Sequence, residues 1–454
     1  MNLKSINPAN LTLIAEYTQD SDSLIQTKLD NSNFAFLHWR TTNFEHRKIL
    51  MLACQNILLD NKQNYAELIS LEMGKHISES LLEIDKCAWL CEYYAKQSEG
   101  FLSNLTITTD ASESYVSYEP LGPILSIMPW NFPFWQVFRF AVPTIMAGNS
   151  ALLKHASNVT GCSKAIENIF LKAGFPQFLF QSLLIGSEKV EEVINHKHIK
   201  AVALTGSEKA GSLVASQAGN CIKKVVLELG GSDPFIVLRD ADLEEAAKMA
   251  VKSRFINNGQ SCIAAKRFFI ENSIYEDFLK LVVSKVKELR VGNPLESNID
   301  LGPMARIDLL EGIEKQLNES VRLGANILCG GKRMELAGAY FQPTVLSNVT
   351  DKMPVFTEEV FGPIMPLFSA NNEEECLRLA NDCKYGLGAS IWTNDIAKAK
   401  KLAVDIESGS VFINGMVKSD PRLPFGGIKL SGHGRELSDL GIKEFVNIKT
   451  VWIK

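Results

Sequence analysis

Hydrophobic and polar positions in the first hundred residues follow the spacing of amphipathic helices. Residues 44–60 and 65–73 carry apolar side chains three and four positions apart. Residues 105–119 (LTITTDASESYVSYE) instead alternate polar and apolar around an Asp-Ala-Ser turn, which predicts an exposed two-stranded ribbon. Because unpaired strand edges tend to associate, we expect this ribbon to be an oligomerisation arm. A plain surface hairpin is the alternative.

From residue 124 onward, short β-rich runs alternate with helical patterns. A first set comprises residues 124–128, 151–154, 183–185, 201–205 and 225–229, and a second set comprises 235–238, 268–270, 327–329, 364–368, 389–392 and 410–414. This alternation predicts an α/β fold with two doubly wound, Rossmann-like domains and a boundary near Gly230-Gly231. Such sheets bind ligands at the carboxyl ends of their strands.

Composition narrows the class of protein. A chain of 454 residues exceeds what one core usually supports, and 46% hydrophobic with 22% charged residues is ordinary for a globular protein. A net charge of −5 gives no electrostatic basis for a nucleic-acid or membrane partner. Nine cysteines are scattered singly, which is typical of reduced thiols. We expect a cytoplasmic enzyme for a small molecule, with no bound metal.

Three residues are candidates for catalysis. Cys262 ends the turn-rich stretch 257–262 (NNGQSC), where a glycine permits close ligand approach and the cysteine N–H is free to donate to an oxyanion. Glu228 lies in an apolar strand, so it is either paired or neutral with a raised pKa, as a general base requires. Asn131 lies between aromatic residues and prolines, which suits a rigidly held donor. The alternatives are a structural cysteine, a satisfied structural glutamate and a turn asparagine.

Other candidates follow predicted strands. Gly206 and Ser207 join a strand to a helix, and the N–H groups at a helix start suit a phosphate. Lys154 also ends a strand. A bare strand-to-helix turn and a solvated surface lysine explain the same residues.

These residues lie in motifs that resemble the aldehyde dehydrogenase superfamily. The motifs are PWNFP (129–133), LTGS (204–207), LELGG (227–231), GQSC (259–262), EEVFGP (358–363) and PFGG (424–427), and they span nearly the whole chain. HASNVTGC (155–162), LGPMAR (301–306), FINGMVKSD (412–420) and SGHGREL (431–437) resemble the short bacterial NAD(P)-dependent succinate-semialdehyde dehydrogenases. The resemblance implies the aldehyde dehydrogenase fold, with a cofactor-binding domain (1–104 and 121–230), a catalytic domain (231–430), and an oligomerisation arm with a C-terminal strand (105–120 and 431–454).

The resemblance also implies a mechanism. The Cys262 thiolate attacks the aldehyde, and the Asn131 amide and the Cys262 N–H hold the oxyanion. Hydride transfer to the nicotinamide leaves a thioester, which Glu228 hydrolyses by activating water. Relatives that pass the thioester to CoA generally lack this glutamate, so a free acid is expected.

For the cofactor, the resemblance places Trp130 and Lys154 near the adenosine and its ribose, and Gly206 and Ser207 by the adenosine and diphosphate. It places Glu359 and Phe361 near the nicotinamide and its ribose. Strictly NAD-dependent relatives carry a glutamate where this chain has Ser157. Without that negative charge we expect NAD or NADP to be accepted.

For the substrate, Arg139 matches an arginine that semialdehyde enzymes use to hold a carboxylate, and Ser419 and Arg422 are further candidates. Ile256 stands where many such enzymes have a second arginine, and Ile263-Ala264 after Cys262 excludes a two-cysteine redox switch. The expected activity is oxidation of succinate semialdehyde to succinate by a homodimer or homotetramer. A broad-specificity aldehyde dehydrogenase and a non-catalytic nucleotide-binding scaffold are the alternatives.

Overall fold

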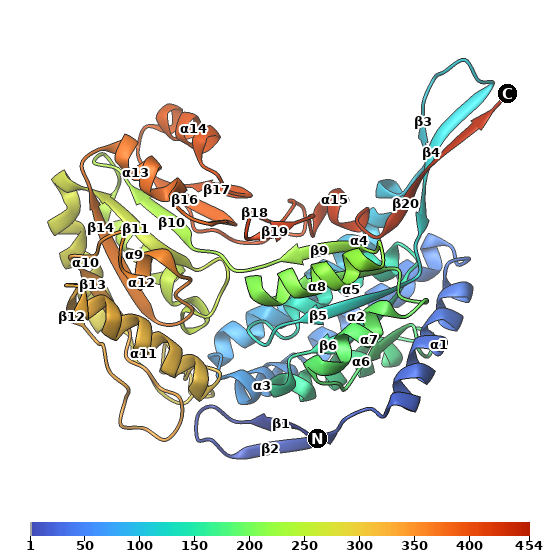
Figure 1. Ribbon diagram of the computed structural model, residues 1–454, viewed down its shortest axis with the longest axis horizontal. Helices are drawn as coiled ribbons and strands as arrows, with labels where there is room; N and C mark the ends of the chain where they lie inside the picture. Colours follow the sequence, from blue (N-terminus) through green and yellow to red (C-terminus); the bar gives the residue numbers. More distant parts are fainter. Residues whose placement is uncertain (1) are drawn as a thin grey trace.

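The computed structural model describes residues 2–454, which form two lobes and a projecting arm (Figure 1). The first lobe is built on a six-stranded sheet in the order β19-β9-β8-β5-β6-β7. Its strands are β5 (Pro123–Met128), β6 (Ser150–His155), β7 (Phe180–Ser182), β8 (Ala201–Thr205), β9 (Lys224–Glu228) and β19 (Gly432–His433). All neighbours are parallel except β19, which runs antiparallel to β9.

The second lobe is built on a seven-stranded sheet in the order β12-β13-β14-β11-β10-β16-β17. Its strands are β10 (Asp233–Val237), β11 (Ala265–Glu271), β12 (Asn326–Cys329), β13 (Thr344–Ser347), β14 (Ile364–Ala370), β16 (Gly388–Trp392) and β17 (Ser410–Ile413). The central strands are buried throughout. Burial on both faces is usual for parallel strands covered by crossover helices, and it explains the apolar runs within these strands, such as Phe268–Ile270 of β11.

Helices cover both sheets. They are α1 (Asp22–Trp39), α2 (Phe44–Asp60), α3 (Lys62–Met73), α4 (Ile77–Phe101), α5 (Trp135–Met146), α6 (Thr160–Lys172), α7 (Val190–Asn195), α8 (Glu208–Asn220), α9 (Leu243–Phe255), α10 (Tyr275–Lys287), α11 (Ile307–Arg322), α12 (Pro354–Thr357), α13 (Glu373–Asn381), α14 (Ile396–Asp405) and α15 (Ser438–Ile442). Every residue of α5 is buried, because α4 covers it on one side and the first sheet on the other. Within residues 2–454 we find no helix with the length and apolar character that crossing a bilayer demands.

The arm differs from the predicted ribbon. It has three strands in the order β20-β4-β3, and the full-length partner of β4 (Glu113–Pro120) is the C-terminal strand β20 (Val446–Ile453). The expected partner, β3 (Leu105–Thr106), is only two residues long. Residues 105–119 therefore do not form a two-stranded ribbon by themselves, because β4 takes most of its pairing from β20. Figure 1 shows the arm extending away from both lobes.

Other strands also depart from the prediction. A strand expected at 183–185 is β7 at Phe180–Ser182 instead. The polar residues Gln181 and Ser182 interrupt the apolar pattern, yet both are buried. Hydrogen bonds satisfy them, because Gln181 donates to the Lys28 carbonyl and Ser182 donates to the Ser163 carbonyl. The strand β13 and an N-terminal hairpin, β1 (Asn2–Ile6) with β2 (Leu13–Thr18), were not predicted. Gly432 and His433 pair with β9, so they lie on the first sheet rather than in the arm.

Candidate active site

Three residues with left-handed backbone form the turn before Cys262. Asn257 and Asn258 have φ of 50° and 57°, which asparagine tolerates better than other non-glycine residues, and Gly259 has φ of 74°. The Asn257 amide donates to the Asn131 carbonyl at 2.8 Å, and the Asn258 amide donates to the Pro303 carbonyl at 2.7 Å. A Cβ on Gly259 would collide with the Gly362 carbonyl. Side-chain hydrogen bonds and steric contacts therefore fix the turn.

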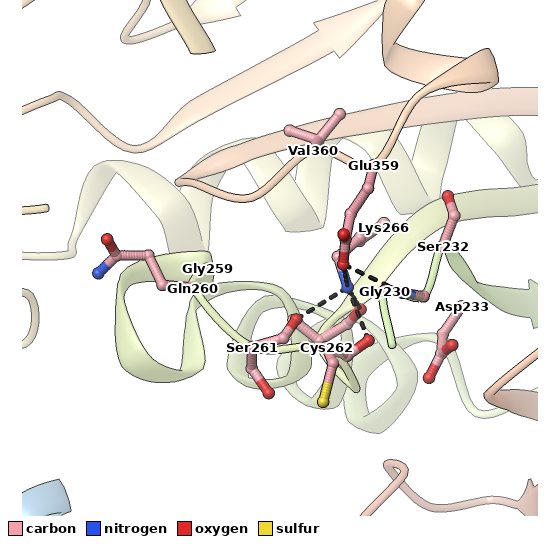
Figure 2. Close-up of polar contacts among 12 residues, drawn as sticks. Gly230, Ser232, Asp233, Gly259, Gln260, Ser261, Cys262, Lys266, Glu359 and Val360 are labelled. Atoms are coloured by element: carbon pink, nitrogen blue, oxygen red, sulfur yellow. Dashed lines mark hydrogen bonds and ion pairs between the residues drawn. The ribbon is translucent and has the colours of Figure 1, made fainter. Parts of the chain in front are cut away.

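Lys266 fixes the backbone on the other side of the nucleophile. Its buried ammonium donates to the carbonyls of Ser261 and Cys262, both at 2.8 Å, and lies 3.4 Å from a Glu359 carboxylate oxygen. Figure 2 shows the ammonium between Glu359 and these carbonyls, while the Cys262 sulfur points away from it. The peptide that carries the nucleophile is thus tied to a buried cation.

Cys262 lines a cavity of about 690 Å³ between the two lobes. Apolar side chains, among them Phe132, Trp135 and Phe425, make up much of its wall. Burial raises the pKa of the Cys262 thiol to about 11, although the nearby Arg139 and Lys266 lower it. A thiol with this pKa is protonated near neutrality, so its attack on a carbonyl requires a base.

Glu228 is the carboxyl that the sequence predicts as a general base. It ends β9, is 3% exposed, and neither carboxyl oxygen has a hydrogen-bond partner among residues 2–454. Burial, reinforced by Glu436, raises its pKa well above 4.5, against the opposing effect of Arg139. At Gly426 a Cβ would approach the Glu228 carboxyl to 2.7 Å, so the PFGG glycine leaves room for this side chain.

Asn131 lies against the Cys262 turn. Its buried amide nitrogen donates to the Gln260 carbonyl at 3.1 Å, which leaves one of its two N–H groups for another acceptor. His155 supports the loop, because its Nε2 donates to the Pro133 carbonyl at 2.9 Å and its Nδ1 accepts from the Ala156 N–H at 3.0 Å. Burial lowers the pKa of His155 to about 4, which keeps this imidazole neutral.

A buried carboxylate on α4 holds the end of the same loop. One Glu83 oxygen accepts from the backbone N–H groups of Phe134 and Trp135 at 2.8 and 2.9 Å, at the start of α5. The other Glu83 oxygen forms a buried ion pair with Lys75. The negative charge of Glu83 at this helix start is therefore stabilised by the Lys75 cation and by two backbone N–H dipoles.

The predicted cofactor residues gather at the carboxyl ends of β5, β6 and β8. In the parallel register Met128 is opposite His155, which brings Trp130, Lys154 and Ser157 to one edge. Ser207 caps α8 by accepting from the Ala210 N–H at 3.3 Å, and Gly206 precedes it. The half-buried Lys154 has a pKa lowered by burial, and Ser157 is exposed.

Two predicted cofactor residues come from the second lobe. The Phe361 ring meets the Trp130 ring edge-on, with centroids 5.8 Å apart. The Glu359 carboxylate accepts from the Gly231 N–H at 3.1 Å, in addition to its contact with Lys266. The edge of the first sheet and the second lobe thus face each other here.

The structure separates the three predicted substrate residues. Arg139 is buried in the cavity wall, where it pairs with Glu436 and lies over the Phe425 ring with its guanidinium carbon 4.6 Å from the centroid. Ser419 also lines the cavity. Arg422 does not, because its side chain is 66% exposed and binds Asp420 through two contacts of 2.8 and 2.9 Å. Arg139 and Ser419 therefore lie in the wall of the cavity that contains Cys262, whereas Arg422 lies at the surface; which residue holds the substrate carboxylate stays a prediction.

Sequence reasoning missed several residues of the site. Lys266 is a charged residue in the buried strand β11, and that pattern is the same signal that singled out Glu228. Glu83 and Lys86 belong to an amphipathic helix, where charged residues are expected on the solvent side, so nothing in the sequence marked them. Ile256, in place of an arginine, contributes an apolar part of the cavity wall.

A thiol, an amide donor and an unpartnered carboxyl suit oxidation of a carbonyl compound through a thioester, the chemistry of thiol-dependent dehydrogenases. Comparison with known proteins gives the same class. Residues 1–451 match the model of the "Aldehyde dehydrogenase family", and the chain belongs to that family.

Similar proteins cover the whole chain. It is 49% identical over 453 residues to the "Probable succinate-semialdehyde dehydrogenase [NADP(+)]" of Synechocystis sp., with all of both chains covered. It is 44% identical over 456 residues to the "Succinate-semialdehyde dehydrogenase [NADP(+)] 1" of Mycobacterium bovis, again with full coverage. The crystal structure of the Streptococcus pyogenes succinic semialdehyde dehydrogenase with NADP+ superposes with a TM-score of 0.97 at 35% identity, covering 99% of each chain.

Proposed function

We propose that this protein oxidises succinate semialdehyde to succinate with NADP or NAD. The observation that carries the proposal is the cavity itself. It has the Cys262 nucleophile, apolar walls, and a polar region with Arg139 and Ser419. A short aldehyde with a distant carboxylate matches this arrangement. The names of the full-length relatives support the same substrate and cofactor.

The side chains account for acylation. Glu228 takes the thiol proton, and the Cys262 sulfur forms a bond to the aldehyde carbon as the carbonyl oxygen becomes an oxyanion. The free N–H of the Asn131 amide and the Cys262 N–H donate to that oxyanion. A bound nicotinamide supplies the hydride acceptor, which leaves a thioester on Cys262.

Deacylation uses the same carboxyl. After Glu228 has released the thiol proton to solvent, its carboxylate takes a proton from water as the water oxygen attacks the thioester carbon, and it then gives that proton to the departing Cys262 sulfur. The apolar pocket around Glu228 raises its affinity for that proton. The product is a free acid, and the thiol is regenerated.

The cofactor edge fits a dinucleotide with a 2′-phosphate. The start of α8 after Gly206 offers N–H groups, Lys154 offers a cation, and Ser157 brings no negative charge. Ser157→Glu should shift the ratio of kcat/KM for NADP over NAD toward NAD. An unchanged ratio would refute this cofactor assignment.

We propose that the arm joins subunits into a cytoplasmic homodimer or homotetramer. Ile448 and Trp452 on β20 are exposed apolar side chains, 63% and 50% exposed. Such strands usually find a partner surface. The native mass in solution tests the assignment, and a monomer would refute it.

The substrate is tested by kcat/KM for succinate semialdehyde and for uncharged butanal, on wild type, Arg139→Gln and Arg422→Gln. Arg139→Gln should lower the value for the charged aldehyde by about 10- to 1000-fold with a smaller effect on butanal. Arg422→Gln is the matched control, because its side chain is exposed and bound to Asp420. If wild type used butanal as well as succinate semialdehyde, a broad-specificity aldehyde dehydrogenase would replace this proposal.

A further inference from the structure

Another cation in the cavity wall is Lys86. Lys86 projects from α4, and its ammonium donates to the Ser419 hydroxyl at 2.6 Å. The same ammonium lies 4.3 Å from the centroid of the Trp135 ring, a cation–π distance. Lys86 therefore touches both a polar and an aromatic part of the wall around the substrate cavity.

Lys86 differs from the two fully buried cations near it, Lys75 and Arg139, by having no carboxylate partner. The buried Lys75 pairs with Glu83, and Arg139 pairs with Glu436. Among residues 2–454, Lys86 forms no ion pair. The close contacts of its ammonium are the Ser419 hydroxyl and the face of the Trp135 ring. A half-buried ammonium without a counter-ion is costly, so this position favours an anion from outside the protein.

We propose that Lys86 binds the carboxylate of the substrate, together with Ser419, and sets the preference for a carboxylate-bearing aldehyde. This inference rests on the proposed function. Because Glu436 already matches the charge of Arg139, Lys86 adds to the Arg139 hydrogen-bond donors the positive charge that the incoming carboxylate neutralises. Its three N–H donors allow one to remain on Ser419 while another binds the ligand.

The proposal includes a pH dependence. Burial, reinforced by Arg139 on α5, lowers the pKa of Lys86 to about 8, against the opposing effects of Cys87 and Glu83 on α4 and of Asp420 beside Ser419. Lys86 is charged below this pKa and neutral above it. KM for the charged aldehyde should therefore rise as pH increases through about 8. Cys262 and Glu228 act on every aldehyde, so the ratio of kcat/KM for succinate semialdehyde over butanal isolates Lys86.

The experiment measures that ratio from pH 6.5 to 9.5 for wild type, Lys86→Met, Lys86→Arg and Lys248→Met. Lys86→Met keeps the stem but removes the charge, and it should lower kcat/KM for succinate semialdehyde about 10- to 100-fold, mainly through KM, while butanal turnover persists. Lys86→Arg should remove the fall of the ratio above pH 8, because guanidinium stays charged. Lys248 is the control, since it lines the cavity but is paired with Glu245.

The outcomes separate this inference from the proposed function. If wild type prefers succinate semialdehyde and Arg139→Gln abolishes that preference, but Lys86→Met changes the ratio no more than Lys248→Met, the role of Lys86 is refuted alone. If wild type has no preference for the charged aldehyde, the proposed function fails. Retained butanal activity in Lys86→Met shows that the variant is folded. A lower ratio of kcat/KM for succinate semialdehyde over butanal then reports on recognition of the carboxylate.

Discussion

Two buried glutamates of the first lobe have opposite surroundings. Glu83 has a lysine and two backbone N–H groups as partners, whereas neither oxygen of Glu228 has a hydrogen-bond partner among residues 2–454. Burial raises the pKa of Glu228 well above its ordinary 4.5. A fully bonded carboxylate holds structure in place, whereas an unbonded one remains free to exchange protons.

The largest expected effect is on the unbonded glutamate. Glu228→Gln should lower kcat about 100- to 10,000-fold, because it removes the general base without changing shape. The stability of the variant should not fall. Turnover is measured by reduced-cofactor absorbance, and folding by thermal unfolding. A variant with near wild-type kcat would show that another group activates water.

The bonded glutamate should show the reverse pattern. Glu83→Gln leaves Lys75 buried without its counter-ion and should cost about 3–5 kcal/mol of unfolding free energy. Urea unfolding measures the loss. Glu92→Gln, on the same helix, is the matched control, because its pair with Lys96 is exposed and should contribute less than about 0.5 kcal/mol. Equal losses in the two variants would contradict the structural role of Glu83.

A substitution of Lys266 tests whether this hydrogen-bonded ammonium also lowers the pKa of the catalytic thiol. Lys266→Met leaves the Ser261 and Cys262 carbonyls without their donor, which should cost about 1–3 kcal/mol of stability. It should also raise the pKa of Cys262, since Lys266 lowers it. The pH dependence of alkylation by iodoacetamide reports that pKa. If alkylation follows the wild-type curve, Lys266 acts on structure alone.

The smallest effect is on the pH dependence of stability. The raised pKa of Glu228 means that the folded state binds its proton more tightly than the unfolded state. The contribution of this protonated carboxyl to stability is complete below the ordinary pKa of 4.5 and is lost as pH rises toward the folded value. Glu228→Gln should therefore become more stable relative to wild type as pH increases above about 5. A difference in unfolding free energy that stays constant with pH would contradict this.

Sequence patterns located most of the fold because the central strands are buried on both faces. The strand expected at 201–205 is β8, and the helix expected at 44–60 is α2. The patterns failed where burial and polarity disagree, as in β7 with Gln181 and Ser182. They also failed at the arm, because β4 pairs with a strand more than three hundred residues away in the chain. Local periodicity carries no information about that partner.

The sequence by itself determined the family, the α/β class and the three residues proposed for catalysis, since short motifs and buried polar residues are local features. Only the tertiary structure decided which charged side chains reach the cavity. It turned Arg422 toward solvent, paired Arg139 with Glu436, and brought Lys86 to Ser419 from a helix 333 positions earlier in the chain. Burial and pairing decide whether a charge is structural or available to a ligand, and both depend on contacts between segments distant in sequence.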